Sequence, residues 1–356
     1  MDMKRDYYED IQYVKRKWVM SVAIVFLLAL FALPVFFSGY SVFLFNLMMV
    51  YVIVAMGLNI LVGYTGQISL GHAGFFAIGA YGTTLLMGEM HLPFIIAIVL
   101  AGFIAALFGF LLGLPALRLK GPYLAIATLG FGMSIMHLIG QEKIFGGRLG
   151  LKVPPLDIGV PQIGLSLVLL KDSGKFYLIL IITILMVLAA RNLMKTRIGR
   201  AFVAIRDSDI AAEVYGVNLL IYKTLAFAIS AFYAGMAGGL FAFVLGFIEP
   251  FTFNILLSIV FLVMIIVGGL GSILGSIVGA LFIAYLQHSL LKNIGELPFL
   301  GKWILAISKR WFTVTGLENF NSIALGLIII GIILFEPKGM NGIWLRFKKY
   351  CITWPF

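Results

Sequence analysis

The chain is poor in charged residues and in cysteine, and both absences narrow the class of protein. Only 12% of its 356 residues are charged and 62% are hydrophobic, whereas a soluble domain has about 25% charged and about 45–50% apolar residues. Soluble and intrinsically disordered proteins are therefore excluded. The single cysteine, Cys351, has no partner within the chain, which excludes a disulfide-stabilised scaffold. The apolar runs are continuous instead of alternating, which excludes an outer-membrane β-barrel.

The sequence also lacks the motifs of common catalytic sites. Gly174-Lys175 is followed by Phe176, and Gly301-Lys302 by Trp303, so neither pair completes a phosphate-binding P-loop. No dinucleotide-binding or zinc-protease motif occurs, and the four histidines have no carboxylate at metal-ligand spacing. We therefore expect no ATPase activity, no catalytic residue, no metal and no bound cofactor in this chain. An intramembrane enzyme would need a nucleophile–base pair or a metal site, and the sequence offers neither.

Carboxylates are missing from the middle of the apolar runs. The ionisable residues closest to these runs fall near the ends of the predicted spans: Glu89, His91, His137, Glu249 and His288. Charge is costly inside a bilayer and is usually functional where it occurs, and carriers driven by protons or sodium ions typically contain such groups. The absence favours an energy source outside this chain.

The continuous apolar runs predict an all-α integral membrane protein, a polytopic bundle of about ten transmembrane helices with broken or re-entrant segments. A helix needs about 20 mainly apolar residues to cross a hydrocarbon core about 30 Å thick. The predicted spans are Trp18–Phe37, Ser41–Val62, Ala73–Met90, Pro93–Leu117, Tyr123–Ile139, Phe176–Ala190, Tyr222–Phe247, Asn254–Val267, Ile273–Leu291 and Asn321–Phe335. The first run is too long for the core of a signal peptide and shows no clear cleavage site, so we expect it to be retained.

Basic residues set the predicted orientation. The net charge is +11, and Lys and Arg concentrate in the cytoplasmic loops of membrane proteins, so the charge does not imply a nucleic-acid partner. An even number of spans places both termini in the cytoplasm, and both terminal segments are basic. The sequence thus predicts a cytoplasmic N-terminal segment (residues 1–17), a transmembrane domain (18–340) and a cytoplasmic C-terminal tail (341–356).

A stretch rich in glycine and hydroxyl groups interrupts the apolar pattern between the second and third spans. Irregular backbone at membrane depth persists only where it is buried in protein or lines a water-filled cavity, and broken helices of transporters bind substrates this way. The candidate pathway residues of this first break are Gly63, Thr65, Gly66, Gln67, Ser69 and Gly71. The alternative is a cytoplasmic turn whose small residues let helices approach closely.

A second break follows the eighth span. Its candidate pathway residues are Gly268, Gly269 and Gly271. Gly271, Gly275 and Gly279 recur every four residues and share one helix face, which favours close helix packing over a substrate pathway. A break at a similar place in each half suggests an internal repeat, although no residue-level similarity between the halves supports one.

The predicted cytoplasmic segment from 191 to 221 contains a short helix with its own start and stop signals. Asp207 or Ser208 is suited to cap the helix N-terminus, Asp209 lies in the first turn at the positive end of the helix dipole, and Gly216 suits the left-handed C′ position. Ile210 and Val214 are four residues apart on one face. The pattern predicts either an amphipathic helix on the headgroups or a docking helix for a soluble partner.

Several long motifs occur in a fixed order between about Gly57 and Met340. They are GLNILVGYTGQISLGHAGFFAIGAY, LRLKGPYLAIATLGFG, RIGRAFVAIRDSDIAAEVYGVN, TLAFAISAFYAGMAGGLFAF, IIVGGLGSILG and the tail FEPKGMNGI. In this order they resemble the Liv-type permeases of branched-chain amino acid ABC transporters, and the LivM subunit more than its partner LivH.

The resemblance implies a permease that works by alternating access and is driven by partner ATPases. The segment 191–221 would be the coupling loop that contacts these ATPases, and its matching positions are Asp207, Asp209, Ala211, Ala212, Glu213 and Gly216. The implied partners are a LivH-like second permease subunit, two ATP-binding subunits and an extracytoplasmic amino-acid-binding protein. The implied location is the plasma (inner) membrane of a prokaryote, and ATP would be bound by the partner subunits alone.

Two alternatives stay open at this point. A related ABC permease for urea, short amides or other amino acids would share these motifs, since substrate choice depends largely on the separate binding protein. A stand-alone carrier or channel would need no ATPase, and it would be recognised by mid-span carboxylates or by transport through the purified single chain.

Overall fold

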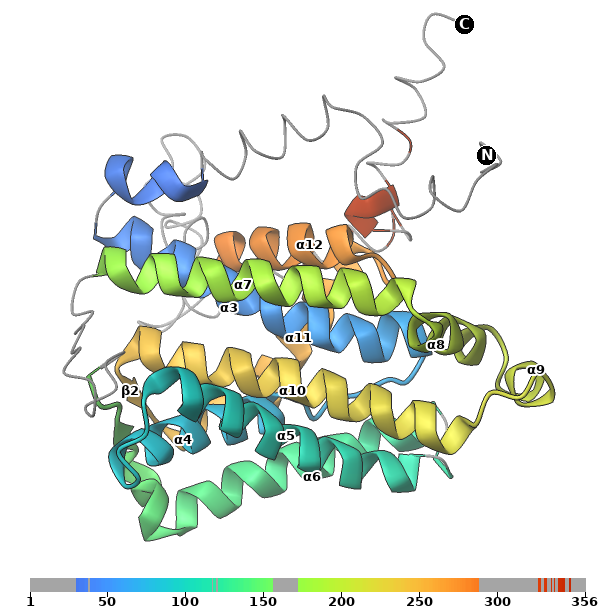
Figure 1. Cartoon of the computed structure of the whole chain (residues 1–356), viewed down its shortest axis with the longest axis horizontal. Helices are drawn as coiled ribbons and strands as arrows, with labels where there is room; N and C mark the ends of the chain where they lie inside the picture. The colour runs from blue at the N-terminus through green and yellow to red at the C-terminus, as the bar shows by residue number, and fades with distance from the viewer. Residues whose placement is uncertain are drawn as a thin grey trace, which may run out of the picture.

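The computed structural model describes residues 30–155 and 172–287, apart from positions 38, 117 and 120, together with scattered positions between 326 and 346. This part of the chain is almost entirely helical (Figure 1), and its long helices lie side by side. The prediction of an all-α polytopic membrane protein is confirmed. Most of the first and tenth predicted spans, residues 1–17 and most of the C-terminal tail lie outside the described residues.

Five of the described helices are long and apolar enough to cross a membrane. They are α3 (Tyr40–Asn59, continued by the π-helical turn Ile60–Tyr64), α5 (Phe94–Ala116), α6 (Pro122–Gln141), α7 (Asp172–Lys195) and α10 (Leu219–Leu245). Three shorter helices also lie among the described residues: α4 (His72–Gly88) and the apolar helices α11 (Ile255–Gly268) and α12 (Ile273–Tyr285). The chain is therefore a multi-pass membrane protein, and these eight helices coincide with the second to ninth predicted spans.

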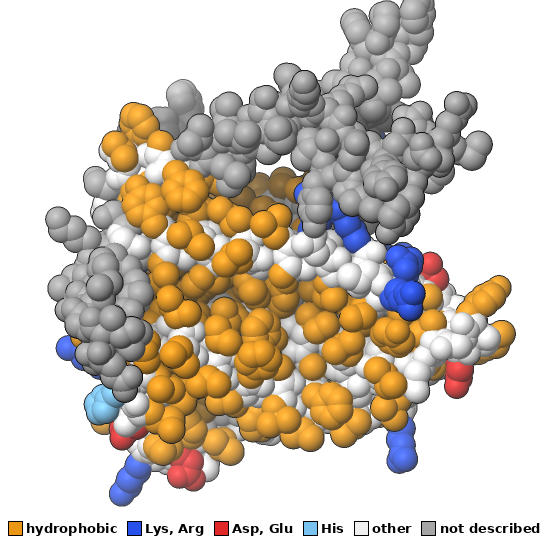
Figure 2. Space-filling model, in the orientation of Figure 1, with side chains coloured by type: hydrophobic (Ala, Val, Ile, Leu, Met, Phe, Trp, Pro, Cys, Tyr) orange, Lys and Arg blue, Asp and Glu red, His pale blue; other side chains and the backbone are white. Residues whose placement is uncertain are grey.

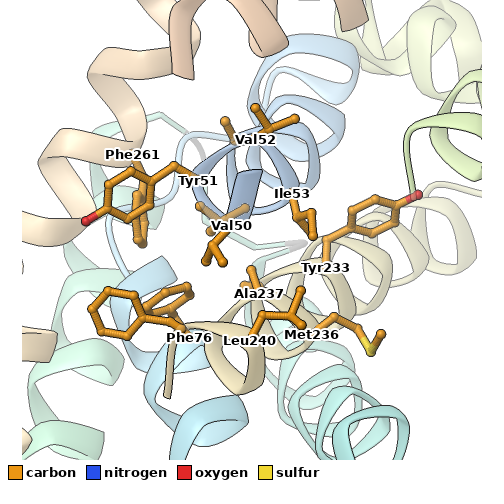
Figure 3. Close-up of a cluster of buried hydrophobic side chains, with 14 of the residues drawn as sticks. Val50, Tyr51, Val52, Ile53, Phe76, Tyr233, Met236, Ala237, Leu240 and Phe261 are labelled. Carbon is orange, nitrogen blue, oxygen red and sulfur yellow. The ribbon is translucent and has the colours of Figure 1, made fainter. Parts of the chain in front are cut away.

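Of the five long helices, α3 and α10 are the most buried, and they form the centre of the bundle. In the most apolar stretch of each helix, 78% of the residues are buried in α3 and α10, against 33% in α5 and α7 and 22% in α6. Figure 3 shows one core cluster, in which Val50 and Ile53 of α3 lie against Ala237 and Leu240 of α10. A helix that is apolar on all sides is expected at such a central position.

Glycines let α10 approach α4 and α5 at backbone distance. A Cβ atom at Gly238 would overlap the Phe76 carbonyl of α4, and one at Gly79 would overlap the Gly235 carbonyl of α10. On the other side, a Cβ at Gly235 would lie 2.7 Å from the Ala105 Cβ of α5. Small residues are common at helix–helix contacts in membranes, because lipid tails are as apolar as the side chains and helix association therefore depends on close packing.

The two ends of the bundle differ. At one end α8 (Arg197–Asp207) and α9 (Asp209–Val214) project beyond the long helices, as Figure 1 shows. At the other end the strands β1 (Leu151–Lys152) and β2 (Phe247–Ile248) pair in antiparallel fashion. Hydrophobic side chains cover the flank between these ends, and most of the visible charged side chains lie near them (Figure 2). This distribution suits a bilayer around the flank.

The predicted coupling segment contains more helix than the sequence pattern indicated. Helix α7 continues to Lys195, past the expected span end at Ala190. A separate helix, α8, then precedes α9, and the sequence analysis did not identify it. One face of α8 buries Phe202 and Ile205 while Arg197 and Arg200 are exposed, so α8 packs on the end of the bundle as an amphipathic helix.

Candidate functional site

The short helix predicted in the coupling segment is α9. Of the two candidate caps, Ser208 is the one used, because its Oγ accepts the Ala211 N–H at 3.3 Å. Asp207 is instead the last residue of α8. Asp209 occupies the first turn of α9, and Gly216 adopts the left-handed conformation at φ +83°. Local side-chain chemistry thus defines both ends of this helix.

Helix α9 exposes an apolar surface. Ile210, Val214 and Tyr215 expose 75%, 79% and 87% of their surface, respectively, and Ala211 and Glu213 are also exposed. Only Ala212 of the predicted coupling residues is buried. The apolar patch formed by Ile210, Val214 and Tyr215 is therefore accessible to a partner.

An ion pair attaches α9 to the central helix α10. The Lys223 Nζ lies 2.8 Å from the Asp209 Oδ2, and the two side chains expose only 8% and 23% of their surface. A buried cation needs such a partner, because its removal from water is otherwise costly. The start of α9 is thereby connected to the first turns of α10.

The first break is held by protein groups on both sides. Gly63 still lies in the π-helical turn, and the irregular stretch runs from Gly66 to Gly71. The Leu70 N–H donates to the Thr128 Oγ1 of α6 at 2.9 Å. Close contact with α6 also explains Gly71, since a Cβ there would overlap the Thr128 carbonyl. The Leu70–Gly71 end of the break is thus packed against α6, while Gly66 and Ile68 are exposed, so the break is only partly buried in protein.

A buried histidine connects this break to α10. His72 Nε2 lies 2.7 Å from the Ser230 Oγ, and His72 Nδ1 lies 3.0 Å from the Ser69 Oγ. Ser230 donates its own proton to the Gly57 carbonyl at 2.7 Å. The network therefore assigns the neutral tautomer with a proton on Nε2, because Ser230 is left as an acceptor and Ser69 as a donor. The contacts give His72 a structural role in this site.

The second break is joined to the first by Asn59, the last residue of α3. The Asn59 Oδ1 accepts the Gly271 N–H at 2.9 Å, while its Nδ2 donates to the Ser272 carbonyl at 3.0 Å and to the Ser276 Oγ at 2.6 Å. A Cβ on Gly63 would overlap the Asn59 Oδ1. One buried amide thus connects the end of α3 with the start of α12.

The glycines of the second break have two different roles. Cβ atoms at Gly268 and Gly275 would each overlap the carbonyl of the other, and one at Gly279 would overlap the Met264 carbonyl. These residues let α11 and α12 pack closely. Gly271 instead faces the first break, with the Gly63 carbonyl 3.2 Å and the Arg206 Nη1 2.9 Å from the position of its absent Cβ.

An open cavity of about 330 Å³ lies where the first break, α6, α8 and α9 meet. Its walls include Thr65, Gly66 and Gln67 of the break and Arg206 and Asp209 of the coupling segment. Gln67 donates from Nε2 to the Thr65 Oγ1 at 3.0 Å. The structure thus brings three of the predicted pathway residues next to one predicted coupling residue, Asp209.

The exposed face of α6 differs from that of α5. Along α5 the exposed residues are apolar and mostly large, including Phe103, Leu107 and Leu111. Along α6 the exposed residues include a row of small and polar side chains at alternating spacings of three and four: Ala127, Gly130, Ser134, His137 and Gln141. Such a row shares one helix face. The small members of this row suit close contact with another helix, and α6 also exposes the large apolar residues Tyr123, Ile126, Met133 and Leu138.

Sequence reasoning missed Asn59, Arg206 and Lys223 as site residues. Asn59 ends an apolar run, and a polar residue at that position was a usable signal. Arg206 lies in the predicted coupling segment without an assigned role, and Lys223 falls at the start of the predicted span Tyr222–Phe247. Asn59 bonds to a residue 217 positions away in the sequence, Arg206 to one 143 positions away and Lys223 to one 14 positions away. No local sequence pattern therefore identifies these three site residues.

Comparison with known proteins places these features in one family. The family model of the permease component of branched-chain amino acid transport systems matches residues 40–335, which include both breaks and the coupling segment. The LivM permease protein of the high-affinity branched-chain amino acid transport system of Escherichia coli K12 is 34% identical over 302 residues, covering 78% of this chain and 70% of the relative. The LivM protein of Salmonella typhimurium LT2 gives the same values.

A more distant relative has another named substrate. The permease protein LsrC of the autoinducer 2 import system of Salmonella typhi is 26% identical over 253 residues, covering 68% of this chain and 62% of the relative. No solved structure matches the chain significantly. The strongest similarities above are thus to permease components of membrane transport systems.

Proposed function

This chain belongs to the family of permease components of branched-chain amino acid transport systems, and from this membership we propose that it is the LivM-like permease subunit of an ABC importer. Its cargo is leucine, isoleucine and valine. The identity of 34% to LivM, against 26% to the autoinducer 2 permease, favours this substrate class over others that related permeases carry.

The observation that carries the transport mechanism is the connection between α9 and the two breaks. An exposed apolar helix supports docking to a soluble partner, and the ion pair from Asp209 to Lys223 supports transmission of its movement to α10. ATP binding closes the partner ATPases, α9 moves with them, and the helices around the breaks reorient to give alternating access. This chain supplies no ATPase site, and ATP is bound by the partners.

The complex contains two permease chains, two ATP-binding subunits and an extracytoplasmic amino-acid-binding protein in the inner membrane of a prokaryote. The second permease is LivH-like. The exposed row of small and polar residues on α6 supports contact of this helix with the second permease chain, because small residues let helices approach closely. Thr65, Gly66 and Gln67 line the cavity between the first break and the coupling segment.

Co-purification and uptake test the proposed function together. The tagged chain, extracted in mild detergent from its native membrane, should bring two P-loop ATPases and a second hydrophobic chain, identified by mass spectrometry. Vesicles containing this assembly and the binding protein should accumulate labelled leucine only with internal ATP, and unlabelled isoleucine or valine should compete. Competition by urea or by other amino acids alone would transfer the assignment to the related permeases. A folded chain recovered alone that transports without ATP would establish a carrier or channel.

Two substitutions test α9 as the coupling element. Glu213→Lys reverses an exposed charge on α9, and Gly216→Val forces a β-branched residue into a left-handed conformation at φ +83°. Both should abolish ATP-driven uptake while leaving membrane insertion intact. Gly246→Val is the matched control, because Gly246 has φ +73°, has equally open space around its Cβ position and ends α10 at the far end of the bundle. Normal uptake by both α9 variants would refute the assignment.

A further inference from the structure

Arg206 lies between the coupling helix and the membrane part of the chain. It occupies the last turn of α8, two residues before the cap of α9. Its Nε and Nη2 donate to the neighbouring Asp207 Oδ1 at 3.2 and 3.1 Å, which fixes the plane of the guanidinium. The remaining Nη1 donates to the Gly63 carbonyl at 3.3 Å. One side chain therefore reaches from the coupling segment to the π-helical turn that ends α3.

The same side chain is packed against backbone of both breaks. The absent Cβ of Gly66 would lie 3.4 Å from the Arg206 Cγ, and that of Gly271 would lie 2.9 Å from the Arg206 Nη1. Both glycines adopt positive φ, at +71° and +73°. A Cβ at Gly66 would make ordinary van der Waals contact with the arginine, whereas one at Gly271 would displace the guanidinium, so Gly271 makes room for this cation.

The groups that Arg206 touches already form one unit. Asn59 binds Gly271, Ser272 and Ser276 of the second break, and its amide fills the space beside Gly63. A displacement of the Gly63 turn is therefore passed to the start of α12 through the buried side-chain amide of Asn59. Through the Arg206 side chain, α8 contacts these connected groups.

Arginine suits such a position better than other residues. Its planar fork presents several donors at fixed angles, so one edge can be held by Asp207 while the other holds a backbone carbonyl. A lysine offers a single rotatable ammonium group and a glutamine offers no charge. The arrangement thus depends on the guanidinium group itself and not only on a positive charge near a membrane surface.

We propose that Arg206 is a positioning residue that transmits movement of α8 and α9 to the two membrane breaks. The proposal rests on the proposed function, because the movement originates in partner ATPases. It predicts that loss of Arg206 leaves ATP hydrolysis intact and removes its effect on the breaks.

A single-cysteine reporter measures this effect. Cys351 is the one native cysteine, so Cys351→Ser provides a background for Ile68→Cys. Ile68 lies in the first break and exposes 40% of its surface. In the full transporter in membranes, the rate of maleimide labelling at this position is measured without nucleotide and with ATP and vanadate. With Arg206 in place, the two rates should differ at least about fivefold.

The Arg206→Gln variant should reduce this difference to less than about twofold, with assembly and ATPase rate preserved. Arg200→Gln is the matched control on the same helix, because its Nη1 contacts the Lys195 carbonyl at 3.2 Å and neither break. The control should retain the full difference. If Arg206→Gln fails to assemble, Arg206→Lys, which keeps the charge and loses the fork, should show a reduced difference instead.

The outcomes separate the proposal from its premise. An undiminished ATP-dependent difference in an assembled Arg206→Gln or Arg206→Lys transporter would overturn the role of Arg206 and leave the importer assignment standing. An equal loss in Arg200→Gln would also overturn it, because the effect would then follow from charge on α8. No ATP effect in the chain with Arg206 in place, together with no ATPase in the complex, would overturn the proposed function itself and the inference with it.

Discussion

The ion pair between Lys223 and Asp209 gives a prediction whose sign depends on which partner is removed. The Lys223 side chain exposes 8% of its surface and the Asp209 side chain exposes 23%. Asp209→Asn leaves the more buried cation without a counter-charge, which should destabilise the attachment of α9 by about 3 kcal/mol. Lys223→Met leaves a carboxylate that reaches water and lies at the N-terminus of α9, and it should cost about 1 kcal/mol. The double variant should resemble Lys223→Met.

Hydrogen exchange measured by mass spectrometry in detergent reads this local stability. The peptide from 209 to 217 contains the protected amides of Ala212, Tyr215, Gly216 and Val217, which donate to Ser208, Ala211, Glu213 and Ala212. Its exchange should accelerate about 100-fold in Asp209→Asn and about fivefold in Lys223→Met. A peptide from the buried middle of α10, such as 231–244, is the internal control and should not change.

The reasoning fails if both single variants accelerate exchange equally, because burial of the lysine would then not matter. It also fails if the double variant is worse than either single one, since the pair would then not be the interaction removed. An acceleration that extends to the control peptide would indicate global unfolding instead of the detachment of α9.

Three further predictions concern packing, the buried histidine and the docking surface. Gly238→Ala should destabilise the fold by about 2 kcal/mol, because the new Cβ overlaps a carbonyl of α4; its thermal unfolding, followed by tryptophan fluorescence, should begin at a lower temperature than that of Gly130→Ala, whose Cβ meets nothing within 4 Å. Ser230→Ala removes the acceptor of the His72 Nε2 proton and should lower stability by about 1–2 kcal/mol in the same assay; an unchanged unfolding temperature would contradict the assigned network. Ile210→Asn, at a position that is 75% exposed, should weaken co-purification of the ATP-binding subunits about tenfold without shifting the unfolding temperature, and unaltered recovery of those subunits would refute docking through α9.

Much of the bundle is predictable because membrane insertion depends on averages over about 20 residues. The spans of α5 and α10 could be predicted from their length and apolar content alone. The ends of α9 are equally local, since Ser208 and Gly216 act through the backbone next to them. The sequence therefore predicts elements whose causes lie within one turn or one span.

The arrangement of the site depends on contacts that no local rule contains. Asn59 resembles an ordinary helix-end residue until α12 is placed beside it. Gly271 fits the small-residue pattern of Gly275 and Gly279, yet it faces Arg206 and the first break instead of α11. The helical nature of α8 was also missed, although Ile198, Ala201, Phe202 and Ile205 recur at the spacing of an amphipathic helix.

Helix α10 is fastened at both of its ends. Near its start, Lys223 is held by Asp209 of α9, and directly after its end β2 pairs with β1. Its 27 residues span about 40 Å at 1.5 Å per residue, which is the whole depth of a bilayer with its headgroups. Glycines pack α10 closely against α4 and α5 along this length. One continuous helix thus joins the two ends of the bundle, so under the proposed coupling a force applied at α9 and one applied at the β1–β2 end would act on the same helix.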